Sequence, residues 1–317
     1  MSDRAAERLE LRNRRVVVTG GHGFLGRHVL SALKDRGAEG IALGRAECDL
    51  TDPAATRAAL TALAPSMVVH TAAAGGGIGW MKDHPATALR ENVLLNTAVL
   101  DACREAGVRR VAVVSSACAY ARDAVQPMRE ATLFEGEPEP TNGPYGWSKR
   151  LAMVHARALG EEHGVDCVVG VPTNLYGPGE SIDPRRSHVV GALVRRFVEA
   201  ADRGSTEETC WGTGRATRDL LHVRDAAEAL LTLLEQGGGP APVNLGSGVE
   251  RTIAEIATTI AHAAGFRGEL AWDATNPDGM PRKVLDVSVM AARTGWSARV
   301  PFEDGVKETV AWFRSSS

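Results

Sequence analysis

A tyrosine and a lysine four residues apart are the residues of this chain whose spacing most directly suggests chemistry. Tyr145 and Lys149, in the segment YGWSK, fall on one face of a helix near its start. An ammonium group beside a phenol stabilises the phenolate and lowers the pKa of the tyrosine from about 10 toward neutrality. The pair therefore predicts proton transfer to or from the oxygen of a carbonyl or an alcohol.

A serine at the end of a strand is the next candidate. The apolar run RVAVVS, over residues 110–115, predicts a buried strand, and Ser116 follows it directly. In a doubly wound sheet, side chains at the carboxyl end of a strand point into the ligand crevice. We expect Ser116 to hydrogen-bond the same substrate oxygen as Tyr145, and the joint pattern is far more specific than either part.

A glycine-rich loop indicates the source of a hydride. The segment GGHGFLG, residues 20–26, follows the strand-like run RVVVT and opens a helical stretch. Glycines there allow a tight turn and a close approach of the backbone to a pyrophosphate, which the amino end of the helix attracts. The loop predicts a dinucleotide site in which a nicotinamide exchanges hydride. The expected cofactor contacts are Tyr145 and Lys149 together with Gly20, Gly23, Phe24, Leu25, Gly26, Ala72 and Ala73.

The end of the second strand decides which dinucleotide is expected. An NAD site usually places an acidic residue there, whereas an arginine accommodates the 2′-phosphate of NADP. The sequence has Gly44 and then Arg45 at this point, with no acid at the strand end. NADP is therefore favoured over NAD, and Asp49 and Leu50 are expected to close over the adenine.

Short apolar runs alternate with helical stretches through the first half of the chain. Such runs predict a parallel sheet covered on both faces, and right-handed crossovers make it a doubly wound α/β sheet of the Rossmann type. Expected strands cover residues 15–19, 41–43, 66–70, 110–115 and 165–171, and expected helices cover residues 85–106, 146–163, 189–203 and 224–236, with a further helix ending near residue 36. We assign residues 1–176, with a returning segment at about 212–246, to an NADP-binding domain, and residues 177–211 and 247–317 to a smaller substrate-binding domain.

Composition and charge disfavour several classes of protein. The chain has 317 residues, 44% of them hydrophobic, and a net charge of −3 from 36 basic and 39 acidic residues, so no nucleic-acid partner is expected. The apolar runs are too short to span a membrane, and the charged first fourteen residues lack the apolar core of a secretory signal. The 5 cysteines form no CxxC pair and predict neither a disulfide framework nor a metal site. A cytoplasmic globular protein is expected.

Longer motifs extend these signals over most of the chain, between residues 15 and 290. TGGHGFLG, SSACAY and EPTNGPYGWSK occur in the order typical of the extended short-chain dehydrogenase/reductases, which the sequence resembles. Within that superfamily it most resembles the GDP-L-fucose synthases, which act on GDP-4-keto-6-deoxy-D-mannose. The stretches that carry this closer resemblance are HTAAAGGG, VPTNLYGP, RRSHVVGALVRRF, WGTGRATRDLLHV and PDGMPRKVLDV.

The resemblance implies two reactions in one site. A ketone at C4 acidifies the protons at C3 and C5, so an acid–base pair can invert both centres before NADPH reduces the ketone. In the family's scheme Cys118 corresponds to the base and His188 to the acid, while Tyr145, Lys149 and Ser116 serve the reduction. The resemblance also implies a homodimer. It places the nucleotide sugar against Asn174, Arg196, Trp211, Arg218 and Lys283, and near the pair Thr141–Asn142.

Two departures from the family pattern leave alternatives open. Ala119, Tyr120 and Ala121 follow Cys118 where the synthases have Ile, then Tyr or Phe, then Pro, and the spelling SSAC resembles the GDP-mannose 3,5-epimerases. With the glycines at 75–77, this difference favours an altered sugar pocket. The alternatives are an epimerase with no net redox change and a relative that acts on another nucleotide sugar in secondary metabolism. A third alternative is a regulator that binds NADP without catalysis. The presence of all the expected catalytic residues argues against it.

Overall fold

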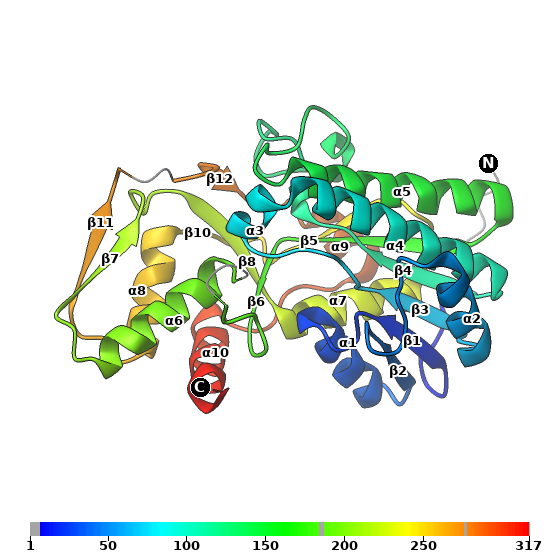
Figure 1. Ribbon diagram of the computed structural model, residues 1–317, viewed down its shortest axis with the longest axis horizontal. Helices are drawn as coiled ribbons and strands as arrows, with labels where there is room; N and C mark the ends of the chain where they lie inside the picture. The colour runs from blue at the N-terminus through cyan, green and yellow to red at the C-terminus, as the bar shows by residue number, and fades with distance from the viewer. Residues whose placement is uncertain (1–6, 184–186, 276–277, 317) are drawn as a thin grey trace.

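The computed structural model describes residues 7–183, 187–275 and 278–316. Its central feature is a six-stranded sheet in which every neighbouring pair of strands is parallel (Figure 1). Across the sheet the order is β2 (Glu39–Leu43), β1 (Arg15–Thr19), β3 (Met67–His70), β4 (Arg110–Val114), β5 (Asp166–Pro172) and β9 (Pro242–Leu245). The chain leaves β1 first to one side and then to the other. This reversal marks the switch point at which doubly wound sheets bind their ligands.

Helices cover both faces of this sheet. One face carries α2 (Pro53–Leu63), α4 (Pro85–Glu105) and α5 (Gly143–His163), and the other carries α1 (Phe24–Asp35) and α7 (Val223–Gln236) (Figure 1). In β1, Val16, Val17 and Val18 are all fully buried, because consecutive residues of a strand point to opposite faces and both faces are covered. Strands of this kind therefore appear in the sequence as continuous apolar runs.

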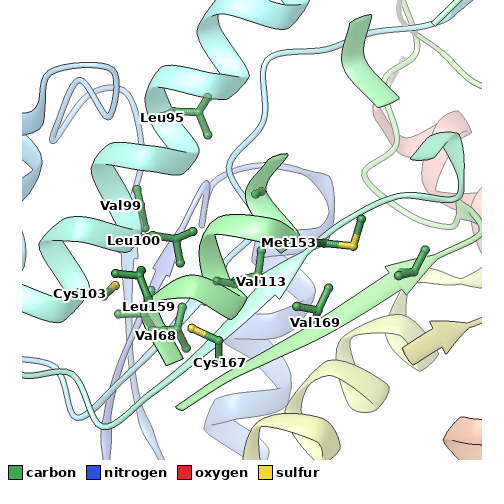
Figure 2. Close-up of a cluster of buried hydrophobic side chains, with 14 of the residues drawn as sticks. Val68, Leu95, Val99, Leu100, Cys103, Val113, Met153, Leu159, Cys167 and Val169 are labelled. Carbon is green, nitrogen blue, oxygen red and sulfur yellow. The ribbon is translucent and has the colours of Figure 1, made fainter. Parts of the chain in front are cut away.

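Figure 2 shows the core between the sheet and helices α4 and α5. Val99 and Leu100 of α4 lie in one cluster with Val113 of β4, and Leu159 of α5 packs into the same cluster. All four side chains are buried, at 5% exposure or less. This packing fixes α5 against β4, and the first turn of α5 carries Tyr145.

The remaining elements form a second, smaller core. The helices α6 (Val189–Asp202), α8 (Ile253–Ala263) and α10 (Phe302–Ser316) pack around Phe197, Ile256 and Phe313. Beside them, β8 (Thr217–His222) pairs with β6 (Asn174–Tyr176), β10 (Glu250–Thr252) and β12 (Arg282–Lys283), and β7 (Glu207–Trp211) pairs with β11 (Glu269–Asp273). Four short segments complete the described chain: α3 (Ile78–Asp83), α9 (Ser288–Thr294), and the 3-10 turns η1 (Ala117–Ala119) and η2 (Glu130–Thr132).

The predicted fold class is confirmed, and β1 covers the predicted residues 15–19. The prediction omits α2, whose sequence PAATRAALTAL buries only Thr56 and Leu60 and so carries a weak apolar stripe. Within the predicted returning segment, α7 and β9 do cover and extend the main sheet, whereas β8 pairs in the second sheet. The domain boundaries themselves stay a prediction.

Parts of two predicted motifs lie outside the described residues: Arg185 and Arg186 of RRSHVV, and Pro277 of PDGMPRK. Among the helices described, none combines the length and the apolar composition that a membrane span requires.

Candidate active site

The glycine loop between β1 and α1 is shaped to hold a pyrophosphate. Gly20 has a φ of +68°, and a Cβ there would lie 2.8 Å from Cα of Ala72 in the loop after β3. A Cβ at Gly26 would overlap the carbonyl oxygen of Gly20. Within the described chain no side chain caps α1 at Gly23, so its first N–H groups remain available to a phosphate. These residues fit a dinucleotide, which would supply hydride exchange when bound. Phe24, Leu25 and Ala73, the other contacts predicted here, lie in the first turn of α1 and in the loop after β3.

Ser116, Tyr145 and Lys149 meet at the carboxyl end of β4. Ser116 caps η1 by accepting the backbone N–H of Cys118 at 3.1 Å, and its hydroxyl also hydrogen-bonds the phenol of Tyr145. Lys149, one turn further along α5, donates to the carbonyl oxygen of Val114 at 2.9 Å. Its ammonium nitrogen lies 5.5 Å from the centre of the Tyr145 ring. The three residues that the sequence predicted to act together are therefore gathered at one point.

Burial, rather than the lysine, governs the ionisation of Tyr145. Removal of the phenol from water raises its pKa, the neighbouring Cys118 raises it further, and the hydrogen bond with Ser116 opposes the rise. The spacing of Tyr145 and Lys149 in the sequence predicts that the lysine lowers this pKa. Instead the Lys149 ammonium is bound to a backbone carbonyl, and burial lowers the pKa of Lys149 itself to about 8. The structure therefore holds Tyr145 as a protonated phenol that can donate.

Two nitrogen donors face the sulfur of Cys118. Nδ2 of Asn142 lies 3.2 Å from Sγ, and Nζ of Lys283 lies 3.6 Å from it. Cys118 is partly exposed, whereas the other four cysteines are buried. Nearby cations and N–H groups stabilise a thiolate, which is the form of cysteine that can accept a proton. Cys118 thus has the surroundings of a reactive thiol.

The second, smaller part of the molecule supplies Lys283. The pairing of β12 with β8 places Lys283 opposite Arg218. Nη1 of Arg218 donates to the carbonyl oxygen of Met280 at 2.7 Å, just before β12 begins. Burial lowers the pKa of Arg218, and Asp278 opposes that change. Two cationic residues predicted to bind substrate are therefore neighbours across one strand pair, close to the thiol.

His188 lies at the amino end of α6. Its backbone N–H donates to Oε1 of Glu180 at 3.1 Å. The imidazole is open to solvent, yet enough protein surrounds it that burial, and then the positive charge of Lys283, lowers its pKa. Lys283 therefore lies near both predicted acid–base residues, Cys118 and His188.

Glu180 is a candidate that no sequence motif indicates. Its side chain is buried, its carboxylate accepts the backbone N–H groups of His188 and Gly191, and burial raises its pKa to about 8. A Cβ at Gly191 would lie 2.9 Å from the carboxyl carbon, so the glycine lets α6 pack directly on this acid. The signal available in the sequence is weak, since an acid eight residues before a helix histidine has no characteristic spacing.

Three further residues are predicted to bind substrate, and their described contacts are with other parts of the chain than Cys118. Nε of Arg196 lies 3.8 Å from the carboxylate of Glu208, Trp211 at the end of β7 is 70% exposed, and Asn174 begins β6. The contacts described for these residues do not join them to Cys118. Their roles stay predictions.

At the adenosine end of the expected cofactor site, Arg45 points into solvent and pairs with an acid. Its side chain is 86% exposed, and Nη2 lies 3.7 Å from the carboxylate of Glu91. Asp49 is exposed and Leu50 is buried, and the contacts predicted for both stay predictions. The sequence places no acid at the end of β2, but Glu47, a little further on, folds its carboxylate back to that point.

Comparison with known proteins places this fold and site in a family. Residues 16–246 match the NAD dependent epimerase/dehydratase family, and the chain belongs to that family. It is an enzyme of the extended short-chain dehydrogenase/reductase type, as the motifs predict.

Within the family, the chain is similar to GDP-L-fucose synthases. GDP-L-fucose synthase 1 of Arabidopsis thaliana is 38% identical over 99% of this chain and 94% of its own length, and GDP-L-fucose synthase of Escherichia coli (strain K12) is 34% identical over 94% and 96%. Among solved structures, a GDP-L-fucose synthetase from Naegleria fowleri superposes with a TM-score of 0.90 at 28% identity, covering 99% of this chain and 98% of that one. The same synthetase bound to NADP superposes with a TM-score of 0.88 at 27% identity, with the same coverage. The resemblance inferred from the motifs is confirmed.

Proposed function

We propose that this chain is an NADP-dependent 3,5-epimerase and 4-reductase that converts GDP-4-keto-6-deoxy-D-mannose into GDP-L-fucose. The observation that carries the proposal is the meeting of Ser116, Tyr145 and Cys118 at one strand end, with Lys283 beside the sulfur. Reduction needs only the serine and the tyrosine, so a thiol beside a cation adds a base to the same site. The names of the full-length relatives support the same substrate.

Cys118 is the proposed base of the epimerisation. A C4 ketone makes the hydrogens at C3 and C5 acidic, because each carbanion is delocalised as an enolate. The thiolate takes a proton from one of these carbons and becomes S–H, and inversion then requires a proton from the other face, which is the role proposed for His188. Lys283 and Asn142 stabilise the sulfur anion. Lys283 also makes the His188 imidazolium a stronger acid, because its charge contributes to the lowered pKa.

Tyr145 is the proposed proton donor of the reduction. As hydride arrives at C4, the carbonyl oxygen must gain a proton, and the raised pKa of the half-buried phenol keeps it protonated for this step. Ser116, already hydrogen-bonded to Tyr145, is placed to donate to the same oxygen. The Lys149 ammonium, 5.5 Å from the ring, stabilises the phenolate that remains. The dinucleotide supplies the hydride when bound, and NADP is the one we propose.

Arg218 and Lys283 are proposed to contact different parts of the substrate. Arg218 is proposed to bind the diphosphate, since a guanidinium can bind two phosphate oxygens at once. Lys283, its neighbour across the strand pair, reaches the sulfur and is proposed to act at the sugar end. The proposed roles of Arg196, Trp211 and Asn174 in the substrate pocket are supported by the sequence resemblance alone.

A single incubation tests this function. Protein is mixed with NADPH and GDP-4-keto-6-deoxy-D-mannose, cofactor oxidation is followed by absorbance, and the product is identified by NMR. Formation of GDP-L-fucose with one NADPH oxidised per sugar is expected. Inversion at C3 and C5 without NADPH oxidation would instead support an epimerase with no net redox change. Unchanged sugar and unchanged cofactor would contradict both.

We propose that two copies assemble through α4 and α5. Apolar side chains of these helices are exposed in the single chain: Leu89 at 37%, Trp147 at 40%, Leu151 at 50% and Val154 at 40%. Exposed apolar groups gathered on one face mark an interaction surface. Light scattering is expected to give twice the chain mass of 33.6 kDa, and Leu151→Glu is expected to give the single-chain mass. A wild-type protein of single-chain mass would contradict the assembly.

The five cysteines are free thiols. A thiol base works only while it stays reduced, and cytoplasmic glutathione keeps thiols in that state. We propose the cytoplasm as the site of action on this ground.

A further inference from the structure

A carboxylate lies over the end of β2 although the sequence places no acid there. Oε2 of Glu47 accepts the backbone N–H of Gly44 at 2.7 Å. Oε1 of the same side chain lies 3.2 Å from Nε2 of His22, which belongs to the glycine loop. A Cβ at Gly44 would lie 3.1 Å from Oε2 of Glu47 and 2.7 Å from Cδ2 of His22. Both side chains therefore cover the strand end directly.

The end of β2 is the position that separates NAD from NADP in this fold. A carboxylate there accepts the 2′-hydroxyl of the adenosine ribose, whereas a guanidinium there accommodates the 2′-phosphate. Arg45 is the guanidinium available, but its side chain is 86% exposed and pairs with Glu91. An exposed pair at 3.7 Å holds a side chain only weakly. The group fixed by hydrogen bonds at the strand end is thus the Glu47 anion.

We propose that Glu47 sets the dinucleotide preference of this enzyme, and that its carboxylate accepts the ribose 2′-hydroxyl of NADH, so that the protein binds NADH as well as NADPH. The inference rests on the proposed function only in assuming that a nicotinamide dinucleotide occupies the cradle. Arg45 provides the positive group for a 2′-phosphate, while Glu47 repels it. Discrimination between the two cofactors is therefore small.

The hydrogen bonds of Glu47 also explain why its side chain returns to the strand. Its pKa is lowered chiefly because its carboxylate accepts the backbone N–H of Gly44, with a smaller contribution from His22. The group is consequently an anion at neutral pH and cannot donate to a phosphate. The carboxylate can accept a hydrogen bond from the ribose 2′-hydroxyl of NADH, whereas it repels the 2′-phosphate of NADPH.

Calorimetric titration of the protein with NADH and with NADPH, without sugar, tests the proposal. The variant is Glu47→Gln, which removes the charge and keeps an oxygen for the N–H of Gly44. The matched control is Glu105→Gln, which removes one charge from an exposed acid at the end of α4 that pairs with Arg57. Both positions are on the surface, so the variants are expected to fold, and circular dichroism checks this.

The wild type is expected to bind NADPH less than tenfold more tightly than NADH. Glu47→Gln is expected to shift the ratio of the two Kd values toward NADPH by at least fivefold, because a hydroxyl contact weakens while a repulsion is lost. Glu105→Gln is expected to leave the ratio unchanged. A larger wild-type preference, or a shift in Glu47→Gln no greater than in the control, would overturn the assignment of Glu47. Failure of both dinucleotides to bind would overturn the proposed function as well. An error about the sugar has no effect on these titrations.

Discussion

The ammonium nitrogen of Lys283 lies 3.6 Å from the sulfur of Cys118, although 165 positions separate the two residues in the chain. Cys118 belongs to η1, which follows β4 of the main sheet, while Lys283 ends β12 in the second sheet. The two parts of the molecule therefore meet at the sulfur of Cys118, the proposed base. This arrangement couples the chemistry at the thiol to the part of the chain proposed to hold the substrate.

Removal of the Lys283 charge is expected to slow the epimerisation. Lys283→Met keeps an unbranched side chain but leaves the thiolate without its cation, so exchange of the C3 and C5 hydrogens with solvent deuterium is expected to fall by about ten- to a hundredfold. NMR of the sugar measures this exchange. Lys307→Met, at an exposed lysine of α10 that pairs with Asp304, is the control and is expected to leave the rate unchanged. Equal exchange rates in the two variants would contradict the role of Lys283.

The pH dependence of the same exchange tests His188. Burial first, and then Lys283, lower the pKa of His188 below its ordinary value. The donor role proposed for His188 requires the imidazolium form, so exchange is expected to decline as pH rises through this lowered pKa. Lys283→Met removes one lowering cause, so the decline is expected to move to higher pH. A decline that stays in place or moves to lower pH would show that His188 is not the donor.

Loss of the Tyr145 phenol is expected to separate the two reactions. In Tyr145→Phe the C4 oxygen has no proton donor, so NADPH oxidation is expected to fall by about 10²- to 10⁴-fold. Exchange at C3 and C5 is expected to continue within a few-fold of the wild type, because Cys118 and His188 are unchanged, and this retained exchange also shows that the variant is folded. Parallel loss of both reactions would contradict the division of roles.

Cys118→Ser is expected to give the opposite pattern. A serine hydroxyl is a much weaker acid than a thiol and does not form the anion at neutral pH, so exchange is expected to fall by about 10²- to 10⁴-fold. NADPH oxidation continues and yields a sugar that is reduced at C4 without inversion, which NMR distinguishes. Cys48→Ser, at a cysteine after β2, is expected to retain the wild-type product. Full exchange in Cys118→Ser would exclude the thiol as base.

Glu180 is expected to make the stability of the folded chain depend on pH. Burial raises its pKa to about 8, above the value of about 4.3 expected in the unfolded chain. The folded chain therefore holds this proton more tightly, and stability is full below the unfolded pKa and declines as pH rises toward 8, by on the order of a few kcal/mol. Glu180→Gln is expected to remove this decline. The free energy of unfolding, obtained from urea titrations at pH 5 and pH 8, measures this decline. An equal change between the two pH values in wild type and variant would contradict the assignment.

The sequence predicts those parts of the site that depend on local periodicity. Tyr145 and Lys149 are one helical turn apart, and Ser116 follows an apolar run, so their approach needs only a helix and a parallel strand. The acid–base residues could be assigned only through the family resemblance. Contact between Lys283 and Cys118 requires the pairing of β12 with β8, and no local pattern encodes that pairing.

Two further residues show why side-chain direction limits prediction. Glu47 stands beyond the strand end in sequence, yet its side chain turns back to the N–H of Gly44 and so occupies the position where an acid was not expected. The Glu180 side chain lies in the loop before α6 and accepts the backbone N–H of His188 at the amino end of that helix. The sequence also predicts a lowered pKa for Tyr145, which is wrong, because burial of the phenol outweighs the effect of a lysine that bonds to a backbone carbonyl.

Turnover of the wild-type protein in deuterium oxide, with NADPH and GDP-4-keto-6-deoxy-D-mannose, shows whether one site carries out both epimerisation and reduction. We expect deuterium at C3 and C5 of the product, protium delivered to C4, and one NADPH oxidised for each sugar. A reduced product without deuterium at C3 and C5 would contradict this expectation, since the thiol and the imidazole would then take no part in the reaction.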